Sequence, residues 1–412
     1  MSSRSLHILL VHQAFVALDE AGGTRHYEFA RYLAQHGHRV TVIASQTSYL
    51  TGTDANKGIE TTAFEGGGSL SILRVRTLPG LHRSFVRRLL NFFSFTWNAF
   101  WAGLRVKGVD VVWGTTPPIF QAASAWALSR LKRAPFVLEV RDLWPAFAVA
   151  VGVLQNPLLI AASEWLERFL YRGAHTVLIN SPGFMAHVQA RGARLVRLVP
   201  NGADAAMFDP QADGAAFRAQ HGLQGKFIAL YAGAHGLSND LGVLLQTAEQ
   251  LRSHPDIQIV LVGDGKDKPG LQAQAAAMQL SNVHFIAPLA KEAMASALAA
   301  ADVCIAILKP LPLYATVYPN KVFDYLAAGR AVVLAIDGVI RQVVADANAG
   351  VFVPPGDPQA MADALLHLST QPEQVRAMGA AGRAFLQAHF NRPQLAAQLE
   401  AVLLETAGKQ AQ

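Results

Sequence analysis

Residues 318–330, Tyr-Pro-Asn-Lys-Val-Phe-Asp-Tyr-Leu-Ala-Ala-Gly-Arg, carry the pattern that decides the fold of this chain. They lie between two short apolar runs of the kind that form buried parallel strands. Pro319 suits the first position of a helix, so Lys321 falls in the first turn and Asp324 lies one turn further along the same face. In an open α/β sheet, a cation and a carboxylate at such a helix start suit a phosphorylated sugar or nucleotide. The alternative is an ordinary amphipathic helix whose charged residues face water.

The same alternation of apolar run and helical pattern continues on both sides of this segment. It predicts an α/β fold with parallel sheets covered by helices. Pro200 and Asn201-Gly202 interrupt the alternation, so we expect one domain over residues 1–199 and a second over residues 200–384. Residues 385–412 contain no further strand, and we expect them to form a helix that crosses back onto the first domain. The expected strands are Ile8–Val11, Arg39–Ala44, Ile72–Val75, Val109–Trp113, Phe136–Val140, Thr176–Ile179, Val196–Val199, Phe227–Tyr231, Ile257–Val262, Val283–Ile286, Val303–Leu308, Ala331–Ala335 and Val351–Val353.

The composition is typical of a folded cytoplasmic protein. The 412 residues are 51% hydrophobic and 16% charged, which argues against disorder. No apolar run reaches the roughly 18 residues of a membrane-spanning helix, and the apolar start Leu6–Val11 is too short for a secretory signal. Cys304 is the single cysteine, so it has no disulfide partner in the chain and is expected in the core.

Charge is distributed unevenly along the chain. Residues 1–199 hold 21 Lys and Arg against 11 Asp and Glu, a balance of +10, whereas residues 200–412 hold 14 against 18, a balance of −4. A basic half suits nucleic acid, an anionic membrane or a phosphorylated substrate. Nucleic acid is the weakest of the three, because the basic residues form no known groove-reading motif, and we expect no nucleic acid partner.

Residues 81–107 are basic and aromatic. On a helix, a narrow polar stripe would stand beside a wide aromatic face, and arginines cluster at both ends. Helices that lie at a membrane surface have this pattern, and we favour contact with the inner face of the cytoplasmic membrane. The competing interpretation is a helix packed on the sheet with unusually large side chains. The polar stripe consists of Ser84, Arg87, Arg88, Asn91, Ser94 and Asn98.

Several common site motifs are absent from the sequence. Gly263-Asp264-Gly265 is not a dinucleotide fingerprint, because Lys268 stands where the third glycine should be. There is no cysteine pair, no His-Glu-x-x-His and no Asp-x-Asp, so we expect neither a bound metal nor a cofactor. A Gly-x-Ser-x-Gly nucleophile elbow is also missing. A nicotinamide dehydrogenase, a metalloenzyme and a serine hydrolase are therefore disfavoured.

Polar residues and glycines gather at the expected carboxyl ends of several strands. Gly22-Gly23 open a helix, where backbone amides can approach an anion closely. Asp142 directly follows a strand and can either face a crevice or cap a helix. The constellation comprises Gly22, Gly23 and Arg25, then Arg141–Pro145, Gly233 and His235, Gly263–Gly265, and Asn320 and Lys321 with Asp324.

Seven segments of the chain match one family. They are residues 22–28 (Gly-Gly-Thr-Arg-His-Tyr-Glu), 37–42 (Gly-His-Arg-Val-Thr-Val), 141–145 (Arg-Asp-Leu-Trp-Pro), 200–204 (Pro-Asn-Gly-Ala-Asp), 319–325 (Pro-Asn-Lys-Val-Phe-Asp-Tyr), 350–357 (Gly-Val-Phe-Val-Pro-Pro-Gly-Asp) and 378–383 (Met-Gly-Ala-Ala-Gly-Arg). In this order they resemble retaining glycosyltransferases of the GT-B fold, family 4-like, group 1. Within that family, the chain most resembles bacterial N-acetyl-L-fucosamine transferases of O-antigen and capsule assembly.

The resemblance implies two Rossmann-like domains whose parallel sheets face a central cleft, with the acceptor on the first and the nucleotide-sugar on the second. It implies a metal-independent, retaining transfer of a sugar, expected to be an N-acetylated amino or deoxy sugar. The donor would be a nucleotide-diphosphate sugar, expected to be UDP-linked, and the acceptor a polyprenyl-diphosphate-linked saccharide in O-antigen, capsule or exopolysaccharide synthesis. The enzyme would be cytoplasmic and peripheral at the inner face of the cytoplasmic membrane.

Carried over residue by residue, the resemblance also implies the site. Catalytic roles fall to Asp142, Lys321, Gly23 and Arg25. Donor-binding roles fall to Gly233, His235, Gly263, Gly265, Pro288, Thr316, Asn320, Lys321 and Asp324, and acceptor-side roles to Gly22, His26, Arg141 and Trp144.

The chain departs from the family at two places. Asp324 matches the second acid of the family's Glu-(seven residues)-Glu motif, which holds the ribose, but Thr316 stands in place of the first acid. The Arg and Lys that follow the first donor-domain strand in the family are replaced by residues 233–237. We therefore expect Lys321 to take over the diphosphate charge. Asp142 stands where the family often has a histidine, and we expect it to orient the acceptor or stabilise the oxocarbenium-like transition state.

Two other functions stay open. A nucleotide-sugar epimerase of GT-B fold would need no membrane face, and a non-catalytic sugar-nucleotide-binding subunit would agree with Thr316 in place of an acid. The donor sugar, nucleobase, acceptor, linkage and oligomeric state also stay open.

Overall fold

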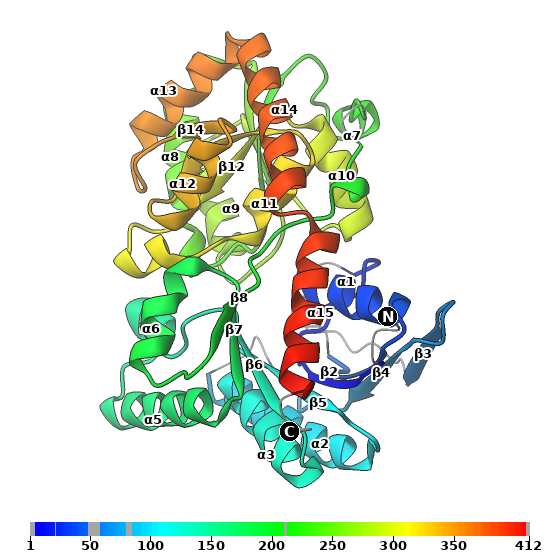
Figure 1. Cartoon of the computed structure of the whole chain (residues 1–412). Coiled ribbons are helices and arrows are strands. Elements are labelled where there is room, and N and C mark those ends of the chain that lie inside the picture. Colours follow the sequence, from blue (N-terminus) through cyan, green and yellow to red (C-terminus); the bar gives the residue numbers. More distant parts are fainter. Residues whose placement is uncertain (1–4, 21, 48–57, 80–84, 210–211, 409–412) are drawn as a thin grey trace. The chain divides into compact units, whose positions relative to one another are not determined.

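The computed structural model describes residues 5–20, 22–47, 58–79, 85–209 and 212–408. It divides into two compact units. Unit 1 comprises Met1–Ala17, Gly23–Pro200 and Pro393–Gln412, and unit 2 comprises Leu18–Gly22 and Asn201–Arg392. Each unit is a parallel sheet covered by helices (Figure 1), so the predicted α/β class is confirmed.

Unit 1 contains an eight-stranded sheet in the order β3-β4-β2-β1-β5-β6-β7-β8. Neighbouring strands run parallel except β3 and β4, which pair antiparallel at one edge. The prediction missed β3, because Ile-Glu-Thr-Thr-Ala has no apolar run and the strand is mostly exposed. The strands are β1 (His7–Val11), β2 (Arg39–Ser45), β3 (Ile59–Ala63), β4 (Ser69–Val75), β5 (Val111–Thr116), β6 (Phe136–Val140), β7 (Thr176–Ile179) and β8 (Val196–Leu198).

Helices cover both faces of this sheet. On one face, α1 and α15 share a core with the strands that includes Phe29, Leu33, Leu399 and Leu403. On the other, α2, α3 and α5 pack side by side. Residues 81–84 of the expected membrane helix lie outside the described residues. The helices are α1 (Arg25–Gln35), α2 (Phe85–Arg105), α3 (Ile119–Lys132), α4 (Ala146–Ala150), α5 (Pro157–Gly173), α6 (Met185–Ala190) and α15 (Arg392–Gly408), with the 3-10 turn η1 (Pro182–Phe184).

Unit 2 contains six parallel strands in the order β11-β10-β9-β12-β13-β14. They are β9 (Phe227–Ala232), β10 (Ile257–Val262), β11 (Val283–Ile286), β12 (Val303–Ile307), β13 (Ala331–Ala335) and β14 (Gly350–Phe352). The helices are α7 (Ala215–Gln220), α8 (Gly242–Gln250), α9 (Lys268–Ala277), α10 (Lys291–Ala300), α11 (Asn320–Ala327), α12 (Val339–Asp346), α13 (Pro358–Ser369) and α14 (Pro372–His389), with 3-10 turns η2 (Ala205–Met207), η3 (Leu237–Asn239) and η4 (Pro312–Thr316).

The C-terminal helical segment differs from the expected single helix over residues 385–412. The first part of it belongs to α14, which packs in unit 2. The helix breaks at Phe390 and Asn391, and α15 then packs in unit 1.

Pro319 caps α11 and does not occupy its first turn. In the described parts of the chain, no helix has both the length and the hydropathy of a membrane span.

Each sheet has one place where successive crossovers leave in opposite directions. In unit 1 this place lies between β1 and β5, and in unit 2 between β9 and β12. Because strand order reverses there, the loops at the carboxyl ends diverge and leave room for a ligand. The polar residues singled out by the sequence lie mainly at these two positions.

Candidate functional site

Lys321 lies in the first turn of α11, at the carboxyl edge of the unit 2 sheet. Its Nζ donates to the Tyr231 hydroxyl at 2.7 Å and to Asn239 Oδ1 at 3.2 Å, and it lies 3.9 Å from the centre of the Tyr231 ring. None of the ion pairs found between described residues includes this lysine. Burial lowers the pKa of Lys321 to about 7. A partly buried cation with only neutral partners suits an anionic ligand.

Two glycine loops close around this lysine. Gly233 follows β9 with φ +149°, and a Cβ there would lie 3.0 Å from Lys321 Nζ. Gly263 follows β10 with φ +145°, and a Cβ there would overlap the carbonyl oxygen of Gly233. A Cβ at Gly265 would overlap the backbone of His235. Side chains at these glycines would therefore force the two loops apart.

His235 is fully buried between the same loops, and neither of its ring nitrogens has a hydrogen-bond partner in the described structure. Burial, together with the charge of Lys268, lowers the pKa of His235 to about 4, so the imidazole is neutral at pH 7. Asn320 also has a buried side-chain oxygen, Oδ1, for which the described structure provides no partner. Buried polar atoms are normally paired, so His235 and Asn320 offer unused hydrogen-bonding atoms beside Lys321.

The other three predicted donor residues have different surroundings. Asp324 Oδ1 accepts a hydrogen bond from Lys291 Nζ at 2.6 Å in an ion pair with the start of α10. Thr316 ends η4 and donates to the carbonyl oxygen of Leu313 at 2.7 Å. Pro288 is partly buried in the loop after β11.

In unit 1, Glu139 organises a second cluster. The carboxylate is 1% exposed within β6 and accepts hydrogen bonds from Arg25 Nε at 3.0 Å, His26 Nε2 at 2.8 Å and Trp113 Nε1 at 3.1 Å. Burial would raise the pKa of Glu139, but His26 and Arg25 outweigh burial and hold it well below its usual range. Burial lowers the pKa of His26 to about 4 although Glu139 acts in the opposite direction, so Arg25 supplies the compensating charge at pH 7.

The guanidinium of Arg25 forms hydrogen bonds within unit 1. Its two terminal nitrogens donate to the carbonyl oxygens of Pro200 at 2.6 Å and Val199 at 2.7 Å. It therefore ties α1 to β6 and to the chain segment after β8. The predicted catalytic role of Arg25 stays a prediction, and these contacts favour a structural role.

His12 joins this cluster to Arg141. Its ring centre lies 3.9 Å from that of His26. Arg141 donates to His12 Nε2 at 3.1 Å, so Nδ1 carries the hydrogen and donates to Thr115 Oγ1 at 2.8 Å. The structure thus brings Arg25, His26 and Arg141 together through two residues that were not predicted.

A chain of hydrogen bonds continues from Thr115 to helix α2. Gln121 Nε2 donates to Thr115 Oγ1 at 2.9 Å, and Gln121 Oε1 accepts from the backbone N–H of Gln13 at 2.7 Å. Gln13 Nε2 donates to Asn91 Oδ1 at 2.8 Å, and Asn91 is a buried residue of α2. Helix α2 is therefore connected to Arg141 by fixed polar contacts.

Asp142 is exposed directly after β6. Desolvation of the carboxyl by the surrounding protein raises the pKa of Asp142 to about 6, while the neighbouring Arg141 acts in the opposite direction. Trp144 packs edge-on against Phe120, with ring centres 6.2 Å apart.

Gly22 has φ +141°, whereas a side chain at Gly23 would meet no protein atom within 4 Å.

Sequence reasoning missed several residues of these clusters. Glu139 had a usable signal, because it is the only charged residue in the apolar run Phe136–Val140. His12 and Gln13 also had one, because they directly follow the first strand. Tyr231 had none, since it reads as one more apolar strand residue.

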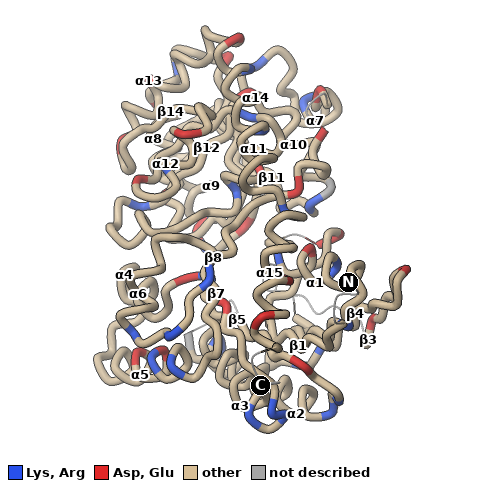
Figure 2. Tube along the Cα trace, in the orientation of Figure 1, with Lys and Arg blue, Asp and Glu red and all other residues tan. Residues whose placement is uncertain are grey.

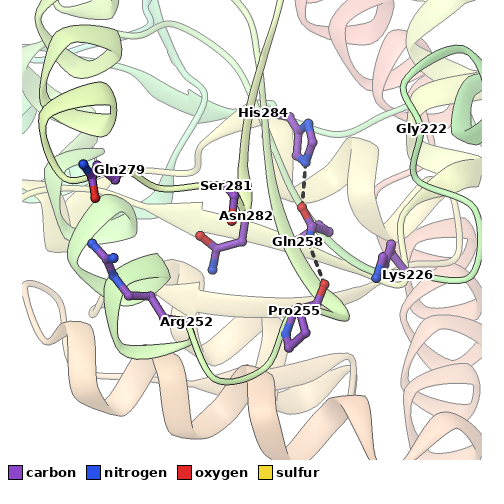
Figure 3. Close-up of a pocket in the computed structure, with 9 residues that line it drawn as sticks. All are labelled: Gly222, Lys226, Arg252, Pro255, Gln258, Gln279, Ser281, Asn282 and His284. Atoms are coloured by element: carbon purple, nitrogen blue, oxygen red, sulfur yellow. Dashed lines mark hydrogen bonds between the residues drawn. The ribbon is translucent and has the colours of Figure 1, made fainter.

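A separate pocket of about 470 Å³ lies in unit 2 (Figure 3). Most of its lining residues precede or begin β9, β10 and β11, so it lies at the amino edge of the sheet, opposite Lys321. Two of its polar groups already have partners: His284 donates to Gln258 Oε1 at 2.6 Å, and Lys226 pairs with Asp256 at 2.7 Å. We therefore place the candidate site at the carboxyl edge. The lining residues are Gly222, Lys226, Arg252, Pro255, Gln258, Gln279, Ser281, Asn282 and His284.

Comparison with known proteins assigns a family model to each half of the chain. Residues 21–202 match the model described as "Glycosyl transferase 4-like domain", and residues 226–371 match the one described as "Glycosyl transferases group 1". The phosphatidyl-myo-inositol mannosyltransferase of Mycolicibacterium smegmatis is 30% identical over 205 residues, which are 49% of this chain and 49% of that protein. The chain spans about half the length of the curated relatives it matches.

Two solved structures share the fold over nearly the whole chain. Sucrose-phosphate synthase from Thermosynechococcus elongatus has a TM-score of 0.77 at 22% identity and covers 97% of this chain and 98% of its own. An Anabaena protein in complex with UDP-glucose has a TM-score of 0.70 at 16% identity, with coverages of 97% and 99%. At these identities the likeness shows the fold.

Proposed function

We propose that this chain, in which a glycosyl transferase 4-like domain and a group 1 glycosyl transferase domain form the GT-B fold, is a retaining glycosyltransferase. The donor would be a nucleotide-diphosphate sugar, with UDP as the nucleotide and an N-acetylated amino or deoxy sugar. The acceptor would be a saccharide on polyprenyl diphosphate, in O-antigen, capsule or exopolysaccharide synthesis. The enzyme would work at the inner face of the cytoplasmic membrane, which it would contact through α2.

The environment of Lys321 is the observation that carries this proposal. A cation with neutral partners, at the start of a helix and at the strand-order reversal of unit 2, fits a diphosphate. The unpartnered ring nitrogens of His235 and the buried Oδ1 of Asn320 would hydrogen-bond the donor beside it. Asp324 would bind the ribose hydroxyls, and its ion pair with Lys291 would hold the carboxylate in position.

The chemistry needs negative charge to be stabilised on the leaving diphosphate. The Lys321 ammonium and the positive end of the α11 helix dipole would supply this stabilisation without a metal ion. The leaving phosphate oxygen would take the proton of the acceptor hydroxyl on the face where the new bond forms, so the sugar keeps its configuration. Positive charge on the sugar ring would be stabilised by a carboxylate, and we assign this role to Asp142, an exposed carboxyl directly after β6.

A lipid-linked acceptor is supported by two observations. The Mycolicibacterium smegmatis relative is a phosphatidyl-myo-inositol mannosyltransferase, so that protein acts on a lipid. In this chain, Asp142 and Trp144 follow β6 in the same unit as the basic aromatic helix α2.

The test is a transfer assay with the purified full chain, a panel of sugar-labelled nucleotide-sugars and a polyprenyl-diphosphate-linked saccharide. We expect label in the lipid fraction with at least one donor, in the presence of EDTA, and no transfer by Lys321→Ala. Conversion of the free nucleotide-sugar without acceptor product would instead identify an epimerase. Donor binding without any turnover would identify a non-catalytic subunit.

A further inference from the structure

Helix α2 presents its apolar side chains to solvent. Its exposed positions recur every three or four residues along one face of the helix. Trp97 is 63% exposed and Val86 64%, values far above those of ordinary core-facing aromatic or aliphatic residues. The stripe runs through Val86, Leu90, Phe93, Trp97 and Trp101, with Arg87 and Arg105 at its two ends.

Three uncharged polar residues of α2, Asn91, Ser94 and Asn98, face the protein. Asn91 Nδ2 donates to the carbonyl oxygen of Leu78 at 2.6 Å, and Ser94 Oγ accepts from the backbone N–H of Leu78 at 2.9 Å. Asn98 Nδ2 donates to the carbonyl oxygen of Arg76 at 2.8 Å. Because these bonds fix the rotation of the helix about its axis, α2 cannot bury the aromatic stripe by turning. The protein-facing side of α2 also buries Phe95 and Ala99. The helix is therefore apolar on its solvent side as well as on its core side, unlike an ordinary helix that covers a sheet in water.

Neighbouring helices extend the apolar surface. On α5, Leu158 is 79% exposed and Trp165 is 65% exposed, and Leu131 at the end of α3 is 62% exposed. Helix α3 contacts both α2 and α5, so the three helices form one layer. Scattered single exposed apolar residues need no explanation, but several large ones on three helices that pack together indicate an interaction site.

The charge of this layer is positive. Helices α2 and α3 contain no Asp or Glu, whereas they carry Arg87, Arg88, Arg105, Arg130 and Lys132. Figure 2 shows lysine and arginine on α2 and α3, and both basic and acidic residues on α5. Aromatic side chains framed by cations suit an anionic lipid surface, where tryptophan enters the interface and arginine contacts the headgroups.

Aromatic contacts lead from this surface to the candidate acceptor residues. Phe93 of α2 is half exposed and packs on Phe120 of α3, with ring centres 4.4 Å apart. Phe120 in turn packs on Trp144, two residues after Asp142. Phe93 of α2 and the start of α3 therefore join the apolar surface to the carboxyl end of β6.

We infer that the outer faces of α2, α3 and α5, framed by their arginines, form a single docking surface for an anionic lipid bilayer, which holds the end of β6 at the headgroup level. The inference deepens the proposed function, on whose lipid-linked acceptor it rests. A bilayer covers the exposed tryptophans of α2 and α5 together, whereas a lone interfacial α2 would leave Trp165 in water.

The test is sedimentation of the full chain with vesicles of phosphatidylglycerol and phosphatidylethanolamine, and with vesicles of phosphatidylcholine alone. We expect binding to the anionic vesicles that weakens with salt, and little binding to the neutral ones. Trp97→Ser with Trp101→Ser should lower the partition roughly tenfold or more, and Trp165→Ser alone should lower it several-fold. The matched control is Ile59→Ser, which removes an apolar side chain that is 72% exposed on the edge strand β3.

Binding of UDP is measured calorimetrically on each variant. The inference is overturned if Trp165→Ser leaves vesicle binding unchanged, or if Ile59→Ser reduces it as much as the tryptophan variants do. It is also overturned if the wild-type protein is a dimer in solution and the tryptophan variants dissociate that dimer. Intact UDP binding alongside any of these outcomes leaves the proposed function standing. If the wild-type protein binds vesicles but does not bind UDP, the proposed function is contradicted, whereas the lipid-docking surface is supported.

Discussion

Lys321 donates a hydrogen bond to the hydroxyl of Tyr231 and lies 3.9 Å from the centre of the same ring. A tyrosine in this position places the ammonium but leaves its charge uncompensated. Lys321→Ala should therefore weaken UDP binding by roughly 30-fold or more, because a diphosphate would lose a partly buried cation that has only neutral partners among the described residues. Calorimetry with UDP measures the effect.

Lys266→Ala is the matched control, because Lys266 is exposed on the neighbouring loop, next to Gly265. UDP affinity should be nearly unchanged in this variant. Equal losses in both variants would mean that general charge attraction, and not the Lys321 site, binds the donor.

Donor binding should depend on pH through the lowered pKa of Lys321. In the protein without UDP, the Lys321 side chain is half-protonated at about pH 7, and a bound diphosphate favours the protonated form. Binding of UDP at pH 8 should therefore take up a proton and weaken as pH rises further. Calorimetry in buffers of different ionisation enthalpy measures this uptake, and its absence in Lys321→Ala assigns it to this residue.

Asp142 should give the acidic limb of the pH profile. Its pKa of about 6 leaves the carboxyl protonated below that pH, and a protonated carboxyl cannot stabilise a positive sugar ring. The rate should thus fall as pH drops through about 6. Asp142→Asn should be slow at every pH and lack this limb, and an unchanged limb in the variant would assign it to another group.

Glu139→Gln should destabilise unit 1. The substitution leaves the buried Arg25 without its counter-charge, which typically costs about 3–5 kcal/mol. Because the pKa of Glu139 is depressed in the fold, its contribution is present above the carboxyl's unfolded value and is lost as pH falls. Urea unfolding at pH 7 measures the loss, and Glu164→Gln, a partly exposed carboxylate of α5, should cost under about 1 kcal/mol.

Asn91→Ala should slow transfer without touching a reactant, because it removes the bond between α2 and Gln13 and so loosens the chain that ends at Arg141. A buried polar group left without its partner costs about 1–3 kcal/mol. Asn98→Ala removes a comparable bond from the same helix, to Arg76, outside that chain. Steady-state kinetics should show a lower kcat only in Asn91→Ala, and equal kinetics in the two variants would contradict a positioning role.

Strands could be predicted well because buried parallel strands are continuous apolar runs. The expected bounds of β6, β7, β10, β11 and β13 agree with the structure. Strand β3 was missed because a solvated edge strand needs no apolar run.

The site could be predicted only in part. Lys321 and Gly233 could be singled out because they lie near the ends of expected strands. The contact between Lys321 and Tyr231 could not be predicted, because it joins residues far apart in sequence. Helical periodicity revealed both faces of α2, but not which one faces the sheet. That direction depends on Asn91, Ser94 and Asn98 bonding the backbone at Arg76 and Leu78, which no periodicity contains.

The packing of α15 in unit 1 has a consequence for synthesis on the ribosome. The core of unit 1 contains Leu395, Leu399 and Leu403, so its α1 face stays open until the last part of the chain has emerged. The sheet of unit 2 is complete by Phe352, and its last helix, α14, ends at His389. The second half of the chain can therefore fold before the first is finished, which reverses the usual N-terminal-first order of co-translational folding.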